Sequence, residues 1–172
     1  MALAGEVVAN TDARPQGMAI LTVGGHVDMP NRGASYDDTR SMFIVLGLEF
    51  DEAVAFDAEG LAALDQGAYD RSLFDGGFTG TFSGPRLSAI LQAVGRPDAA
   101  VTAVALDQYR AEIPAEVIIA YDPILATHLN GQPLGIGGIG PAVVVFPDTG
   151  DPEDALAFDA YEVWATVYLG VD

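Results

Sequence analysis

An aspartate ends an apolar run in the segment VALDQYRAEIP, residues 104–114. Asp107 follows Val104–Leu106, and an aromatic residue, Tyr109, comes two positions later. Such a carboxylate serves either as the corner of a hairpin, where a short polar side chain bonds the nearby backbone, or as an acceptor that faces a ligand. The segment alone leaves both roles open, so the surrounding elements must distinguish them.

Other residues that could carry chemistry have less indicative surroundings. His26 and His128 are far apart in sequence and neither has metal-ligand spacing, so we expect no metal site. The glycine segment GIGGIGP, residues 135–141, precedes a β-branched run and not the helix that a phosphate loop needs, so we interpret it as a tight turn entering a buried strand. The segment DTGDPED, residues 148–154, lacks calcium-loop spacing and is interpreted as an acidic loop. Ser and His residues form no recognisable nucleophile motif.

The charge of the chain disfavours nucleic acids and anionic membrane surfaces as partners. There are 25 acidic residues against 7 basic ones, a formal net charge of −18, and every basic residue is Arg. Nucleic acids and anionic membrane surfaces bind proteins through Lys and Arg, so both are poor partners for this chain. The longest uncharged apolar candidate, Met42–Leu48, is far shorter than the roughly 18 residues that membrane insertion requires.

The chain contains no Cys. Disulfides, thiol catalysis and thiolate metal ligation are therefore excluded. The cellular compartment is left open, because a chain without Cys is compatible with any redox environment.

The hydrophobic pattern predicts an α+β protein with a mixed β-sheet or barrel-like core and two or three short helices. Its 172 residues are typical of one domain, which we expect over residues 19–172 after an N-terminal extension over residues 1–18. The best helix lies within residues 83–95, with Ser83 as its cap and Gly95 at its end. The expected strands cover residues 19–27, 41–50, 100–106, 109–113, 141–147 and 161–171.

Local signals add detail to this expectation. Asp57 is a suitable N-cap for a short helix within residues 56–67. Asn130-Gly131 is the strongest hairpin dipeptide in the chain. The run at residues 141–147 is continuously apolar, so we expect a central strand buried on both faces.

Seven motifs occur along the chain in the order LTVGGHV, FDAEGLAAL, FSGPRLSAILQAVG, VALDQYRAEIP, ILATHLNGQPL, GGIGPAVVVFP and VWATVYLGV. Together they resemble the small, single-domain branch of the oxidoreductase molybdopterin-binding family, which has the sulfite-oxidase-like fold. The resemblance covers roughly residues 19–171, and residues 28–49 fit it least well.

The chain departs from this family where the molybdenum enzymes supply a Cys thiolate to the metal. The corresponding segment here is YDRSLFDGGFTG, residues 69–80. The resemblance implies that small members without Cys are periplasmic and bind a pterin or a molybdopterin-like ligand, without metal and without turnover. It also implies that some act as sensors for membrane proteins that make or degrade cyclic-di-GMP. A periplasmic location requires a signal peptide that has already been removed from this chain.

The resemblance also implies roles for individual residues. Asp107 would accept two hydrogen bonds from the guanidine-like edge of a pterin, since a carboxylate pairs well with adjacent N–H donors. Tyr109, Phe74 and Trp164 would wall the ring. Arg71 and Ser72 would meet the ring carbonyl or its tail, and Gly137, Gly138 and Gly140 would let the ligand approach the backbone.

Two alternative functions stay open. One is a molybdopterin-dependent oxidoreductase that transfers oxygen, against which the missing Cys counts. The other is a ligand-free protein-interaction domain, whose acidity suits a basic partner surface.

Overall fold

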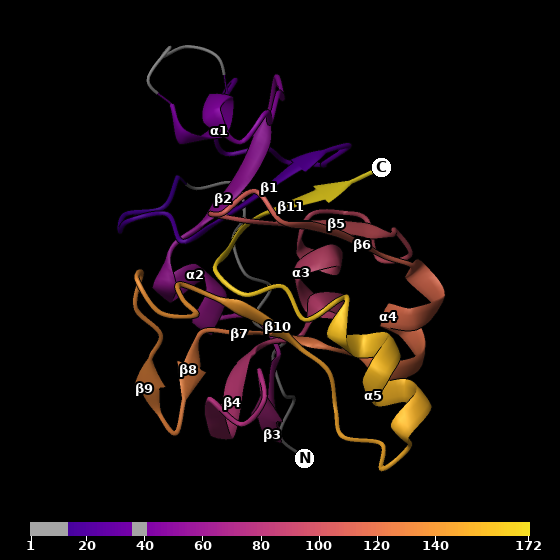
Figure 1. Ribbon diagram of the computed structural model, residues 1–172. Coiled ribbons are helices and arrows are strands. Elements are labelled where there is room, and N and C mark those ends of the chain that lie inside the picture. The colour runs from indigo at the N-terminus through magenta and orange to yellow at the C-terminus, as the bar shows by residue number, and fades with distance from the viewer. Residues whose placement is uncertain (1–13, 36–40) are drawn as a thin grey trace, which may run out of the picture.

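The computed structural model describes residues 14–35 and 41–172. Most of the expected N-terminal extension, and residues 36–40 of the loop expected after residue 27, lie outside this part. The described residues form an α+β protein with five helices and eleven strands in three sheets (Figure 1). The α+β class is therefore confirmed. The expected two or three helices are too few, and the expected barrel-like core is wrong, because none of the described sheets closes on itself.

The largest sheet has five strands in the order β2-β1-β11-β5-β6. Strands β1 and β11, the first and last of the described chain, pair in parallel at its centre, whereas all other pairs are antiparallel. The expectation of a mixed sheet is thus confirmed. The strands are β1 (Leu21–Gly25), β2 (Ala53–Phe56), β5 (Val101–Ala105), β6 (Arg110–Ile113) and β11 (Thr166–Val171).

The other two sheets are smaller. The four-stranded sheet has the order β3-β4-β8-β9, and the third sheet contains only β7 and β10. Asn130 and Gly131, with φ of 51° and 74°, connect β8 to β9, so the predicted hairpin is confirmed. These strands are β3 (Gln66–Leu73), β4 (Phe78–Pro85), β7 (Ile124–Ala126), β8 (His128–Leu129), β9 (Gln132–Pro133) and β10 (Val143–Val145).

Strand β10 differs from its expected position. Its three valines are fully buried, as the apolar run predicted. The strand is not central, however, because it pairs with β7 alone in a two-stranded sheet. Burial on both faces arises here from the packing of separate sheets, which a continuous apolar run cannot distinguish from a central position.

Five short helices connect the strands. The predicted N-cap of α2 is confirmed, because the Asp57 carboxylate accepts the Gly60 N–H at 2.8 Å. Asp151 caps α5 in the same way and Pro152 follows it, so part of the expected acidic loop is the start of a helix. The helices are α1 (Met42–Val45), α2 (Ala58–Ala62), α3 (Leu87–Ala93), α4 (Ala115–Tyr121) and α5 (Pro152–Asp159).

Three predicted elements have different boundaries or types. The strand expected over residues 161–171 begins only at Thr166, which leaves Trp164 in the connection before it. Ser83 does not cap α3, because β4 continues to Pro85 with Ser83 opposite His128, and the helix begins only after Arg86. Residues 41–50, expected as a strand, instead contain α1, where the Ser41 hydroxyl accepts the Phe43 N–H at 3.3 Å. The apolar residues of this segment are therefore not one strand of a sheet.

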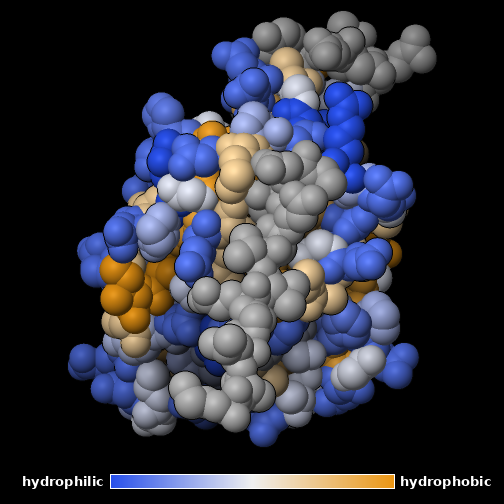
Figure 2. Space-filling view, turned by 180° about the vertical axis from the view of Figure 1, so that it is seen from behind, coloured by the Kyte–Doolittle hydropathy of each residue, from blue (hydrophilic) through white to orange (hydrophobic). Residues whose placement is uncertain are grey.

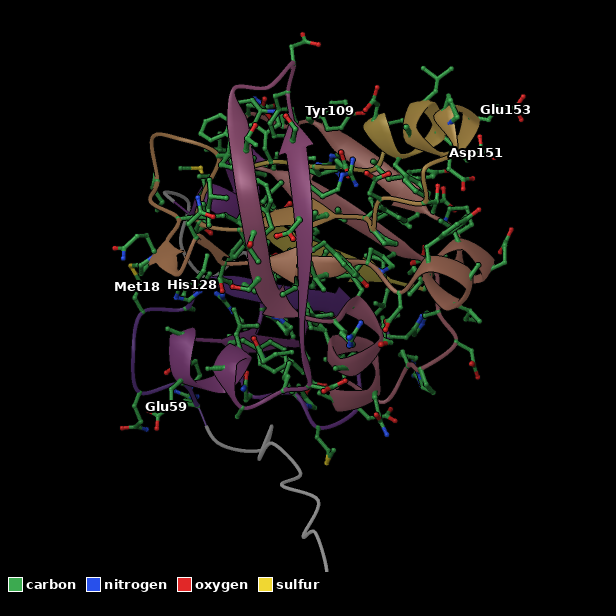
Figure 3. All side chains as sticks on the ribbon, turned by 90° about the horizontal axis from the view of Figure 1, so that it is seen from below. Met18, Glu59, Tyr109, His128, Asp151 and Glu153 are labelled. Atoms are coloured by element: carbon green, nitrogen blue, oxygen red, sulfur yellow. The ribbon has the colours of Figure 1, made fainter. Side chains whose placement is uncertain are left out.

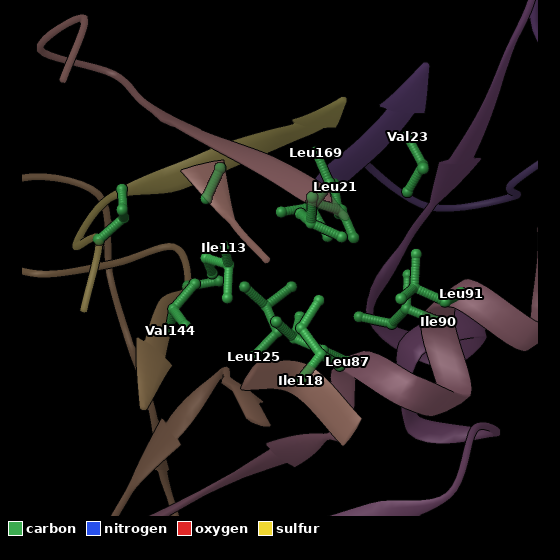
Figure 4. Packing of buried hydrophobic residues seen from close by; sticks show 14 of the residues in the cluster. Leu21, Val23, Leu87, Ile90, Leu91, Ile113, Ile118, Leu125, Val144 and Leu169 are labelled. Atoms are coloured by element: carbon green, nitrogen blue, oxygen red, sulfur yellow. The ribbon is translucent and has the colours of Figure 1, made fainter. Parts of the chain in front are cut away.

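The main hydrophobic core lies between the five-stranded sheet and α3 (Figure 4). Leu87, Ile90 and Leu91 of α3 are fully buried against it, as their spacing predicted. Each such side chain stabilises the fold by about 1.5–3 kcal/mol relative to exposure. Leu21 of β1 and Leu169 of β11 face the helix from the sheet.

The opposite side of this sheet carries a second, aromatic cluster. The rings of Phe50 and Tyr168 stack at 5.9 Å, and Phe43 of α1 contacts Phe50 edge-on at 5.4 Å. The Arg32 guanidinium lies 4.8 Å from the Phe43 ring centre. The described residues within 28–49, the range that fits the family resemblance least well, therefore supply part of a cover for the outer face of the sheet.

The surface agrees with the composition. In the view from behind, most of the coloured surface is hydrophilic, with an apolar patch at the left edge (Figure 2). Among the described residues, no helix has the length and the apolar content needed to cross a membrane.

Candidate functional site

A cavity of about 390 Å³ opens between the β3–β4 hairpin and the end of α5. Its volume lies within the range of about 300–1,000 Å³ that small-molecule sites occupy. Three of the predicted site residues, Arg71, Ser72 and Phe74, belong to its wall. The full lining consists of Arg71, Ser72, Leu73, Phe74, Asp75, Gly76, Asp159 and Glu162.

The turn of the β3–β4 hairpin holds Phe74 at this cavity. Phe74, Asp75 and Gly76 all have positive φ, at 54°, 56° and 82°, and Gly77 N–H donates to Phe74 O at 3.1 Å. Asp-Gly suits such a turn, but a left-handed backbone costs a bulky L-residue about 1–2 kcal/mol. Phe74 is 40% exposed, and its ring meets Phe78 edge-on at 6.3 Å, so its burial is only partial. A strained, exposed aromatic residue at a cavity indicates a functional position.

Arg71 and Glu162 form a buried ion pair in the cavity wall. Their Nη1 and Oε1 atoms lie 2.8 Å apart, and the side chains are only 11% and 3% exposed. Arg71 also donates to Phe146 O, and Glu162 accepts the Phe146 N–H at 3.3 Å. Burial raises the pKa of Glu162, and the Arg71 charge opposes that rise. The charge of Arg71 is therefore already neutralised inside the protein.

Two further acids of the lining have no such partner. Asp75, in the hairpin turn, and Asp159, at the end of α5, are exposed, and among the described residues no basic group lies within ion-pair distance of either. The Asp159 charge adds to the rise in the pKa of Glu162, so the two carboxylates are electrostatic neighbours. One guanidinium and three carboxylates give the lining a formal charge of −2.

The segment between α5 and β11, residues 160–165, brings the other predicted residues to the same region. The Tyr109 hydroxyl donates to Ala160 O at 3.0 Å, and the ring lies at the C-terminal end of α5, away from Asp151 (Figure 3). The Ala165 N–H donates to Ile139 O at 2.8 Å. Tyr109, Trp164 and the glycine segment therefore meet along this α5–β11 connection, although none of them lines the cavity.

Asp107 occupies the corner of the β5–β6 hairpin. Its carboxylate accepts the Tyr109 N–H at 3.0 Å, and Gln108 between them has a φ of 78°. The side chain is exposed and is not part of the cavity lining. Of the two roles that the sequence left open, the hairpin corner is the one that the structure shows.

The remaining predicted residues have identifiable structural surroundings. Tyr109 and Trp164 are 46% and 38% exposed. Gly138 N–H donates to Gly135 O at 3.4 Å, which confirms the tight turn before the buried strand. A Cβ at Gly140 would lie 2.6 Å from Gly135 O, so this glycine is required by the turn itself. Ser72 shares a hydrogen bond of 2.8 Å with Thr79.

Sequence reasoning missed the acidic residues of the cavity. Glu162 gave a usable signal, because it is a lone charge in the apolar segment YEVWATVYL, and a charge in a buried element needs a partner. Asp75 and Asp159 gave none, since 25 acids are spread over the whole chain.

Two further observations bear on the chemistry of this region. Among residues 14–35 and 41–172, no group of three or more His, Asp or Glu side chains could hold a metal ion. A scan against protein-family models finds no match to this chain, and a search of curated proteins finds no relative.

Proposed function

We propose that the protein binds a pterin, or a pterin-like planar molecule, in the cavity between the β3–β4 hairpin and the end of α5, and does not convert it chemically. The observation that carries this proposal is the convergence of an exposed aromatic ring, Phe74, and two unpaired carboxylates, Asp75 and Asp159, on one cavity of suitable size. The periplasmic location and the sulfite-oxidase-like fold belong to the same proposal, and the order of the motifs supports them.

The recognition chemistry follows from the ligand's edge. A pterin presents a flat ring and adjacent N–H donors, which a carboxylate accepts side by side. Asp159 and Asp75 are assigned this role in place of Asp107, because they line the cavity. Phe74 packs against the ring face, and the Ser72 oxygen, which is bonded to Thr79, can accept a hydrogen bond from the hydroxylated tail.

The side chains of the chain do not provide the ligand that a molybdenum centre needs for catalysis. The chain has no Cys to supply the thiolate, and the thioether of Met is a poor replacement for a thiolate. The alternative of an oxygen-transferring oxidoreductase therefore has no support from the residues of the site, and we propose binding without catalysis.

The test is titration of the purified protein with 6-hydroxymethylpterin, followed by ligand fluorescence. We expect saturable binding of one molecule, weakened by Phe74→Ala and by Asp159→Asn. Asp107→Asn keeps the oxygen that accepts the Tyr109 N–H, so the hairpin corner is preserved and binding should persist. Absence of binding by the wild type at high micromolar ligand would reject the proposal, and a loss confined to Asp107→Asn would move the site to the hairpin corner.

A second candidate, a protein-interaction domain, is favoured by the exposure of Tyr109 and Trp164 beside the α5–β11 connection. Exposed aromatic residues are enriched where proteins dock. In the sensor version of the proposal, a membrane signalling protein contacts this surface. Capture of the same partner by wild type and by Phe74→Ala, but not by Trp164→Ala, would favour a docking role that needs no ligand.

A further inference from the structure

We infer that the cavity selects pterins without a phosphate group, neutral or cationic, and rejects phosphate monoesters such as molybdopterin; this inference rests on the proposed function. It concerns the charge of the ligand, which the proposal of a pterin leaves open. The argument comes from the charges that line the cavity and from their partners.

The first step is the state of Arg71, the only guanidinium that the described residues bring to the lining. Arg71 lies 2.8 Å from Glu162 and also donates to Phe146 O. A phosphate at Arg71 would either share the guanidinium with the buried Glu162 carboxylate, which already supplies its counter-charge, or displace that carboxylate and leave it unpaired. Arg71 is therefore a fixed part of the wall and offers an anionic ligand no net positive charge.

The second step concerns the other arginines of the described chain. Arg86 pairs with Asp65 and Asp122, and Arg96 pairs with Asp28. Arg110 donates to Leu46 O and does not belong to the lining. Arg32 donates to Thr22 Oγ1, and Arg14 and Arg32 line a different pocket. Within the described residues, the cavity thus has no second guanidinium that could hold a phosphate in place of Arg71.

The third step is the effect of the unpaired carboxylates. Asp75 and Asp159 stand on two sides of the lining, one in the hairpin turn and one at the end of α5. A phosphate dianion in the cavity is repelled by both, whereas an N–H edge or a cation is attracted. Asp75 and Asp159 are therefore assigned as the residues that determine the charge specificity of the site.

The experiment compares 6-hydroxymethylpterin with its phosphate monoester, which has the same ring. We expect the ester to bind more weakly by about tenfold or more at low ionic strength. The dissociation constant of the ester divided by that of 6-hydroxymethylpterin defines the selectivity ratio. This ratio should fall in Asp75→Asn and in Asp159→Asn, and fall further in the double variant. It should also fall as salt is added, since salt screens exposed charges.

The ratio is the decisive readout, because a lost contact to the common ring affects both ligands equally. Asp98→Asn, which removes an exposed carboxylate outside the cavity, serves as the matched control and should leave the ratio unchanged. Equal binding of both ligands, or tighter binding of the ester, overturns the charge selectivity and leaves pterin binding standing. Binding of neither ligand overturns the proposed function and this inference together.

Discussion

The Glu162 carboxylate lies 2.8 Å from the Arg71 guanidinium and fixes the α5–β11 connection to strand β3 across one wall of the cavity. Both side chains are almost fully buried, so each depends on the other for its charge to be tolerated. This pair links the stability of the fold to the shape of the candidate site.

Arg71→Met should reveal this dependence. Removing one partner of a buried pair costs about 3–5 kcal/mol, because the other charge remains buried and unpaired. Burial already raises the pKa of Glu162, and the loss of Arg71 raises it further. A carboxyl with a raised pKa binds its proton more tightly in the folded state than in the unfolded state. The free energy of unfolding therefore falls as the pH rises above 4.5, the ordinary pKa of a Glu side chain.

Urea denaturation of the Arg71→Met variant and the wild type at pH 5 and pH 7 measures the effect. The destabilisation should be larger at pH 7, where Glu162 is ionised in the unfolded chain but in the folded one must either keep its proton or carry an unpaired charge. Arg96→Met, which removes a longer and more exposed pair with Asp28, is the control and should change stability little. An equal loss at both pH values would contradict the assignment.

Asp57→Ala should destabilise the protein by about 1–2 kcal/mol at neutral pH, the cost of a lost helix cap. The Asp57 carboxylate accepts the N–H groups of Gly60 and Gly17, each at 2.8 Å, and these bonds lower its pKa. Because the folded-state pKa is lowered, the carboxylate stabilises the fold fully above pH 3.8, the ordinary pKa of an Asp side chain. This stabilisation is lost as the pH falls through the lowered pKa of the folded state. The difference between variant and wild type should therefore shrink in acid.

Thermal melts of Asp57→Ala across this acidic range provide the measurement. Glu59→Ala, in the first turn of the same helix, is the matched control, because Glu59 is exposed and does not cap the helix. A similar loss in both variants would indicate a general charge effect at the helix end and not a cap.

Phe74→Gly should separate stability from function. The φ of 54° is unstrained for glycine, and the relief of about 1–2 kcal/mol offsets the lost contact with Phe78 and the greater freedom of the unfolded chain, so stability should change little. The same change removes the aromatic wall and should weaken pterin binding. Parallel melting and titration experiments test both halves, and a variant that is clearly less stable would show that Phe74 serves the fold.

Gly84→Ala should be strongly destabilising. A Cβ at Gly84 would lie 2.1 Å from Leu125 O, where β4 packs against β7, and a backbone atom cannot move aside cheaply. Overpacking of this kind costs about 1–3 kcal/mol or more. Gly135→Ala is the comparison, because a Cβ there meets nothing within 4 Å. Denaturation midpoints of the two variants should differ, and equal midpoints would show that β4 and β7 can separate.

The predictions that were confirmed rest on local signals. The Leu87, Ile90 and Leu91 stripe requires a buried helix face, Asp57 supplies a cap, and Asn130-Gly131 tolerates the positive φ of a tight turn. Each of these signals lies within a few residues, so no knowledge of the rest of the chain was needed.

The elements that were missed depend on distant contacts. The apolar residues 41–50 matched a strand pattern. In the fold they pack against Tyr168 and the outer face of the large sheet, and a short helix followed by a loop can bury them there as well as a strand could. The cavity is formed by β3 and the end of α5, two segments that only the tertiary fold brings together. For the same reason, Arg71 was predicted as a site residue while its partner Glu162 was not.

The parallel pairing of β1 with β11 has a consequence for biosynthesis. Because β11 lies between β1 and β5, the large sheet cannot assemble until residues 166–171 have left the ribosome. A nascent chain stalled before that point would carry two unpaired strand edges, which invite aggregation. Folding of this sheet should therefore wait until β11 has emerged, and chaperones that shield apolar strands are expected to engage the chain until then.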